Sequence, residues 1–114
     1  MESILTSIKK LLGPEEDNTQ FDDDIIIFIN GAIMRLTQLG IGPSTGYAIT
    51  SKDNKWSELI GTRKDLDAVK TYIYLKVRLV FDPPQSGFLV DAIKSQITEL
   101  ESTLNIQAEG GIFT

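Results

Sequence analysis

Apolar residues between positions 63 and 84 repeat with the period of a helix. They form two adjacent stripes, and the first consists of Leu66, Val69, Ile73, Val77 and Val80. The second consists of Tyr72, Leu75 and Leu79. Spacings of three and four predict a helix from about residue 63 to residue 82, and Pro83-Pro84 ends it because proline cannot donate a backbone hydrogen bond. Two stripes exceed one buried face, so we expect the surplus apolar surface to contact a partner.

The same periodicity predicts three further helices. The first covers residues 3–12 and ends at Gly13-Pro14, and the second begins at Asp22 or Asp23 and ends at Leu39, just before Gly40. The acids 22–24 suit the start of that helix, where carboxylates cap free amides and meet the positive end of the helix dipole. The last helix runs from about residue 86 to residue 105, with an apolar face formed by Leu89, Ile93, Ile97, Leu100 and Leu104.

The segments between and after these helices lack a helical pattern. Residues 40–55 contain three glycines and Pro43, which favour an extended loop or a short hairpin, and Trp56–Ile60 suits a single helical turn ended by Gly61. Residues 106–114 contain Gly110-Gly111 and predict a flexible C-terminal tail. We therefore predict an all-α fold, a small bundle of about four helices, with a helical domain over 1–105 and a tail over 106–114.

Composition narrows the class of function. The 114 residues are 41% hydrophobic and 24% charged, which is typical of one globular domain, and no apolar run is long enough to span a bilayer. The start, Met1-Glu2-Ser3, has no signal-peptide architecture, so we expect assembly in a cytosol. The chain has no cysteine and no histidine. It therefore lacks thiol nucleophiles and the commonest general base, which argues against an enzyme.

The charged residues do not form an evident binding site. The net charge is −5 and the basic residues are scattered, which disfavours tight binding to a phosphate backbone. The acids 22–24 could bind Mg²⁺ or Ca²⁺, but adjacent helical positions diverge, and helix capping explains them better. The glycine-rich stretch 40–46 lacks the lysine of a phosphate-binding loop. We therefore expect no metal and no cofactor.

Aromatic residues leave two interpretations open. Tyr72, Tyr74 and Phe81, with Lys70, Lys76, and Arg78 nearby, could bind a single-stranded nucleic acid, but they lie on different sides of one helix. Packing into a core or an interface explains them better. Trp56, the only tryptophan, could be either an interface anchor or a core residue beneath the mid-chain loop.

The order of these segments resembles the small head-tail connector, or adaptor, proteins of tailed bacteriophages. The resemblance covers nearly the whole chain. It is carried by the opening helix with Leu11-Leu12-Gly13-Pro14, the acid-capped helix closing on residues 37–43, Trp56 with Leu59-Ile60-Gly61, and above all the segment from Val69 to Pro84. A last amphipathic helix near the C-terminus completes it.

The resemblance implies a structural subunit without enzymatic activity or cofactor, located in the virion at the head-tail interface and assembled in the bacterial host cytoplasm. Subunits would form a homo-oligomeric ring beneath the portal protein, extend the DNA channel and offer a platform to the next connector, stopper or tail-completion protein. DNA would pass without specific binding, and no membrane would be involved. The candidate interface residues are Trp56, Tyr72, Leu75, Leu79, Ile112 and Phe113.

Two other classes of function remain alternatives. A small acidic helical module could regulate a protein partner or mimic DNA, in which case it should be a monomer or dimer with its acids on one surface. An enzyme with Asp22, Asp23 and Asp24 as metal ligands would require measurable affinity for a divalent metal.

Overall fold

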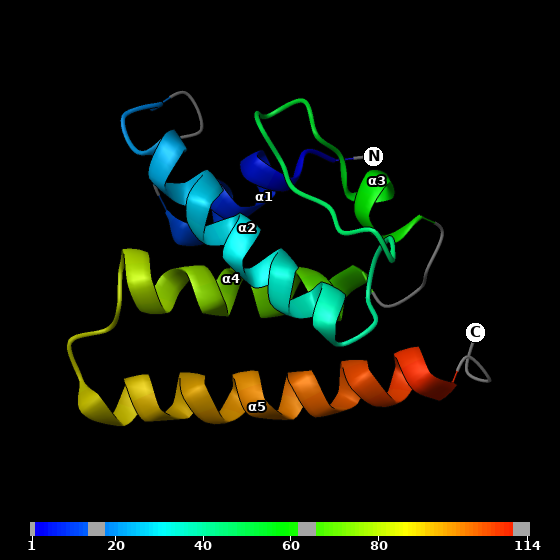
Figure 1. The fold of residues 1–114 in the computed structure, drawn as a ribbon. Coiled ribbons are helices and arrows are strands. Elements are labelled where there is room, and N and C mark those ends of the chain that lie inside the picture. Colours follow the sequence, from blue (N-terminus) through cyan, green and yellow to red (C-terminus); the bar gives the residue numbers. More distant parts are fainter. Residues whose placement is uncertain (1, 14–17, 62–65, 111–114) are drawn as a thin grey trace.

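The computed structural model describes residues 2–13, 18–61 and 66–110. Within these ranges the chain forms five helices and no strand, as predicted for an all-α fold (Figure 1). The helices are α1 (Ile4–Leu12), α2 (Asp22–Gln38), α3 (Trp56–Ile60), α4 (Leu66–Phe81) and α5 (Gly87–Gly110). The short helix α3 is the predicted single turn, and residues 40–55 form an extended loop rather than a hairpin.

The helices α1 and α2 begin and end close to the predicted residues. The side chain of Ser3 accepts a hydrogen bond from the Thr6 backbone and caps α1, and Gly13 ends that helix with a φ of 105°. Gly40 follows α2 in the left-handed region at φ 92°. Helix α2 starts after Phe21 without any side-chain cap bond, so the prediction that its acids cap free amides was wrong.

Helix α5 is longer than predicted. It continues to Gly110, five residues beyond the predicted end at Asn105. The reason is that the apolar period persists past Leu104 to Ala108, which packs against the core. A Cβ placed on Gly40 would lie 3.1 Å from the Ala108 Cβ, so the end of α5 touches the turn that follows α2. Residues 111–114 of the predicted tail lie outside the described residues.

The three other long helices pack around α4. Helix α2 crosses in front of α4, α1 lies behind α2, and α5 runs beside α4 on the side away from α1 (Figure 1). The most extensive helix packing joins α2 to α4, followed by α4 to α5. The core contains a preponderance of isoleucine, and its largest fully buried side chains are Trp56 and Tyr72. Helix α4 is therefore the central element, with apolar neighbours on two sides.

Candidate assembly interface

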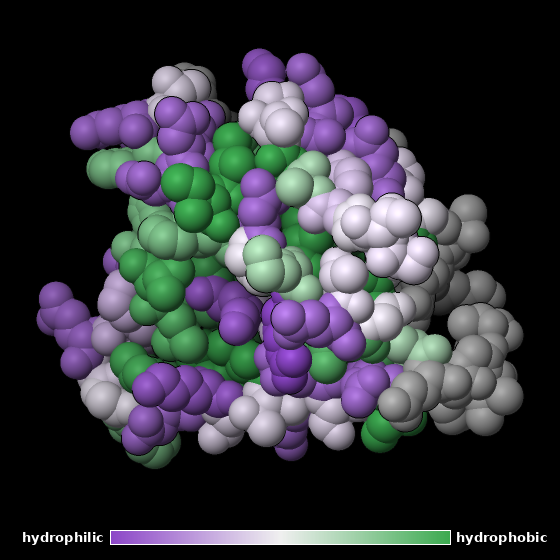
Figure 2. Space-filling view, viewed as in Figure 1, coloured by the Kyte–Doolittle hydropathy of each residue, from purple (hydrophilic) through white to green (hydrophobic). Residues whose placement is uncertain are grey.

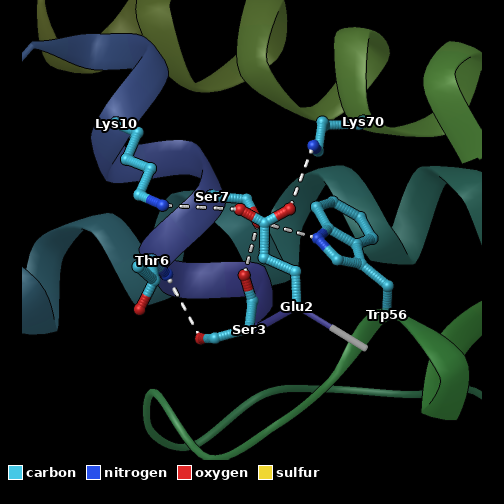
Figure 3. A network of polar contacts seen from close by, with 7 residues as sticks. All are labelled: Glu2, Ser3, Thr6, Ser7, Lys10, Trp56 and Lys70. Carbon is cyan, nitrogen blue, oxygen red and sulfur yellow. Dashed lines mark hydrogen bonds and ion pairs between the residues drawn. The ribbon is translucent and has the colours of Figure 1, made fainter.

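Trp56 is a core residue that joins α3 to α1. Its indole Nε1 donates a hydrogen bond of 2.9 Å to Ser7 Oγ, and Ser7 Oγ donates one of 2.6 Å to the backbone oxygen of Ser3 (Figure 3). The whole side chain is removed from solvent. Of the two interpretations of Trp56, the structure thus supports the core residue, and Trp56 offers no exposed surface to a neighbouring molecule.

The carboxylate of Glu2 connects the start of the chain to α1 and α4. Its oxygens lie 3.8 Å from Lys10 Nζ and 3.3 Å from Lys70 Nζ (Figure 3). Desolvation acts to raise the pKa of Glu2, but the hydrogen bond from Lys70, the closeness of Ser7 and the charges of Lys70 and Lys10 together outweigh it and lower the pKa. Because these charges are partly exposed, the ion pairs orient the N-terminus more than they stabilise the fold.

The second apolar stripe of α4 is used inside the subunit. Tyr72 and Leu75 are buried, and Leu79 packs against the core. The hydroxyl of Tyr72 donates a 2.6 Å hydrogen bond to Glu101 of α5, which shows that α5 covers this side of α4. The surplus apolar surface inferred from the sequence therefore meets a helix of the same chain, and these residues have little surface left for a partner.

Glu101 links three helices. It accepts the Tyr72 hydrogen bond, and its Oε2 lies 3.5 Å from Arg35 Nε of α2. Burial tends to raise the pKa of Glu101, but the Tyr72 and Arg35 hydrogen bonds prevail and lower it. The pKa of Tyr72 is raised, first by burial and then by the same bond. This cluster holds α5 against the α2–α4 layer.

The mid-chain loop is pinned to α2 by one side chain. Asn30 donates its Nδ2 hydrogen to the backbone oxygen of Ile49 and accepts the Ile49 backbone hydrogen, at 3.0 and 2.8 Å. Farther along, Asn54 Oδ1 accepts hydrogen bonds from the backbones of Thr50 and Ser51. The glycine-rich stretch 40–46 is therefore the first part of an ordered loop. Neither asparagine can be identified from the sequence, because an isolated polar residue gives no periodic pattern.

The acids at the start of α2 do not gather around a metal. Asp22 forms an ion pair of 2.8 Å with Lys9, whose Nζ also donates to the backbone oxygen of Asn18. Asp23 and Asp24 are exposed. No group of three or more metal-ligating side chains occurs in the described part of the chain. The Asp22 pair instead joins α2 to α1, a structural role that the sequence interpretation did not include.

Exposed apolar side chains form two surfaces that lie outside the buried repeats of the helices. The first is the α2 stripe, which we define as Asp23, Ile27, Gly31 and Met34. Ile27 and Met34 are 63% and 65% exposed, although both are large hydrophobic residues. Both fall outside the three-four repeat of the buried α2 residues, and that mismatch is the signal that could have found them.

The second apolar surface is the hairpin tip, which we define as Val80, Phe88 and Leu89 where α4 turns into α5. Phe88 is 80% exposed. In Figure 2 apolar side chains gather on the left of the molecule, where α2 begins and α4 ends. Ile112 and Phe113, the remaining predicted interface residues, lie outside the described residues.

Comparison with known proteins gives the context for these surfaces. None of the helices in the described ranges has the length and apolar character needed to cross a membrane. A search of curated proteins finds no match, and neither does a search of solved structures. The sequence family described as "Phage connector protein" matches residues 4–111, which is nearly the entire chain and includes all five helices. The chain therefore belongs to the phage connector protein family.

Proposed function

We propose that this protein is a structural subunit of a head-tail connector ring. The ring docks under the portal protein, extends the DNA channel and presents a platform to the next connector, stopper or tail-completion protein. The observation that carries this proposal is the family match over residues 4–111. The protein acts by binding other subunits, and we propose no catalytic step and no cofactor for it.

The distribution of apolar surface supports an assembly role. The α2 stripe and the hairpin tip lie on different helices, so one subunit has exposed apolar surface for more than one contact. A closed ring of identical subunits requires this, because each subunit contacts its two neighbours through different surfaces. A connector subunit must also contact the portal, and Ile112-Phe113 at the C-terminus stays our candidate for that contact.

The charge of the subunit suits the passage of DNA. The net charge is −5, and exposed acids are distributed over α2, the 40–55 loop, α4 and α5. A ring of such subunits repels the phosphate backbone rather than retaining it. DNA can therefore slide through the ring without specific contacts.

The first experiment measures the solution mass of the purified protein by light scattering across a range of concentrations. Negative-stain images show the form of any large species. Discrete rings are the expected result. If the protein is monomeric, it is then mixed with its candidate portal protein, since a ring can require a template to close.

A protein that stays monomeric in the presence of its portal would contradict the proposal. Duplex DNA serves as a second probe in the same experiment. We expect no binding at physiological salt, and tight binding to DNA would contradict the proposed role as a passive channel.

A further inference from the structure

Two helix faces on the outside of this subunit have complementary character. One is the α2 stripe. The other is the α4 outer face, which we define as Thr71, Tyr74 and Arg78. The side chains of this second face are all partly exposed, and they lie on the side of α4 opposite its buried residues. The α2 stripe carries the carboxylate of Asp23, and the α4 outer face carries the guanidinium of Arg78 near the end of the helix, with the exposed Asp67 about three turns away at its start.

The acidic charge of the α2 stripe has no ion-pair partner in the described ranges of the chain. Asp23 and Asp24 are exposed, and neither forms an ion pair with any described residue. Asp23 lies one turn before Ile27 on the same side of the helix. The stripe therefore presents a carboxylate next to apolar surface.

The guanidinium of Arg78 on the α4 outer face also lacks an acidic partner among the residues that the structure describes. Arg78 Nη1 donates a 3.0 Å hydrogen bond to the Tyr74 hydroxyl, but no carboxylate of the described residues pairs with the guanidinium. The Arg78 Nε is shielded from solvent and has no hydrogen-bond partner in the described ranges. The Arg78 residue as a whole is partly exposed, so a carboxylate from another molecule would bind its terminal guanidinium nitrogens rather than the shielded Nε.

The shape of the α2 stripe allows another helix to approach. Gly31 lies between Ile27 and Met34, and a Cβ placed on it would meet nothing within 4 Å. Because Gly31 has no side chain, another helix can approach the α2 backbone between two exposed apolar residues. A helix that presents Tyr74 and Arg78 fits such a surface. The aromatic side chain of Tyr74 can cover the exposed apolar side chains of the α2 stripe, while the Arg78 guanidinium reaches a carboxylate at the start of α2.

The two faces point away from each other. Helices α2 and α4 make the most extensive packing in the fold, and each of the two faces lies opposite the buried side of its own helix. In Figure 1 the helix α2 lies in front of α4, so its outer face is directed toward the reader. One subunit therefore cannot bring its own two faces together, but two subunits can.

We infer that the α2 stripe of one subunit binds the α4 outer face of the next subunit, with Asp23 or Asp24 paired to Arg78. The inference rests on the proposed connector ring and names its subunit contact. Because the two faces differ and are directed apart, the contact is head-to-tail and can repeat around a closed ring.

Charge reversal tests this contact. Arg78→Glu places like charges across the interface, and so does the pair Asp23→Lys and Asp24→Lys. We expect each variant to weaken assembly by about tenfold or more, measured as the protein concentration at half-maximal ring formation, in free solution or on the portal as the wild type requires. The triple variant with all three reversals should recover assembly to within about threefold of the wild type.

Control variants separate this contact from general effects. Asp53→Lys with Glu99→Lys reverses two exposed acids outside both faces and should assemble like the wild type. Ile27→Gln with Met34→Gln leaves the charge unchanged and should also weaken assembly. Thermal unfolding of every variant reports whether the subunit still folds, and the Gln pair keeps the test decisive if lysines at the α2 start disturb that helix.

The outcomes distinguish this inference from the proposed function. If the wild type assembles and the charge and Gln variants assemble equally well, the inferred contact is wrong while the connector ring stands. If the variants form rings that no longer bind the portal, the α2 stripe is a portal surface, and the inference is again overturned. If the wild type forms no ring with or without its portal, the proposed function itself fails.

Discussion

The hydrogen bond from Trp56 to Ser7 is the contact of a single residue that can be tested most directly. Trp56→Phe removes the indole N–H and some buried volume while it keeps an aromatic ring in the core. We expect a loss of about 1–3 kcal/mol in the free energy of unfolding, measured by urea denaturation. Ser57→Ala, an exposed neighbour on α3, is the control and should change stability by less than about 0.5 kcal/mol. Equal stability of the two variants would contradict the role assigned to Trp56.

Glu101 should make the stability of the protein depend on acid pH. Its pKa is lowered from the ordinary value of 4.5, so its ionised form is favoured in the folded state. The stabilisation is complete above the pKa of the unfolded chain and is lost as the pH falls through the lower folded pKa. We expect Glu101→Gln to be less stable than the wild type at pH 7, and the difference to shrink below about pH 4.5. If the difference in stability between Glu101→Gln and the wild type does not change with pH, the role assigned to the Glu101 contacts with Tyr72 and Arg35 is wrong.

Tyr72 should make the stability of the protein decrease as the pH rises into the alkaline range, the opposite direction to the effect of Glu101. Burial and the bond to Glu101 raise its pKa above the ordinary value of 10.0, so the folded state retains the proton longer than the unfolded chain does. Its contribution is therefore complete below pH 10 and is lost as the pH rises beyond it. We expect Tyr72→Phe to lose less stability than the wild type between about pH 9 and pH 11, measured by chemical denaturation. Parallel losses in both proteins would contradict this assignment.

At the scale of elements, the turn after α2 supports the end of α5. Gly40 has a φ of 92°, and an added Cβ would approach Ala108 to 3.1 Å. Gly46 has nearly the same φ, 93°, but nothing within 4 Å of an added Cβ. Both alanine variants strain the backbone by about 1 kcal/mol, and we expect Gly40→Ala to lose more than that because it also displaces α5. Hydrogen exchange at residues 105–110 should rise in Gly40→Ala only, and equal effects would contradict the contact.

The elements also show how far the sequence determines the interpretation. Periodicity located the four longer helices, because spacing along one helix follows from its own residues. It does not reveal that α5 covers the second apolar stripe of α4, which contains Tyr72, because packing partners depend on the whole chain. The sequence alone therefore predicts that this stripe contacts another molecule. The ends of the helices follow less closely from the sequence for the same reason. Helix α5 continues past Asn105 because Ala108 meets the turn at Gly40, a contact between residues far apart in sequence.

At the scale of the whole molecule, the fold separates its core from its exposed apolar surfaces. The aromatic residues most expected at an interface, Trp56 and Tyr72, are buried, while Ile27, Met34 and Phe88 are exposed. A candidate list based on residue type favours large aromatic side chains, which suit a core and an interface equally well. The candidate site therefore could not be predicted from the sequence until the buried face of each helix was known. Exposed apolar residues outside the buried repeat are the better guide in this chain.

The C-terminal residues provide the last test, because the end of α5 separates folding from docking. Deleting residues 106–114 removes the last helical residues together with Ala108, which packs on the core, so we expect it to lower the melting temperature. Deleting only residues 111–114 removes Ile112 and Phe113 and leaves all of α5 in place. We expect this shorter deletion to melt like the wild type and still form rings, yet to lose binding to the portal in a sedimentation assay. Normal portal binding by the shorter deletion would exclude the C-terminal pair as the docking contact and would leave the hairpin tip as the remaining apolar surface for that role.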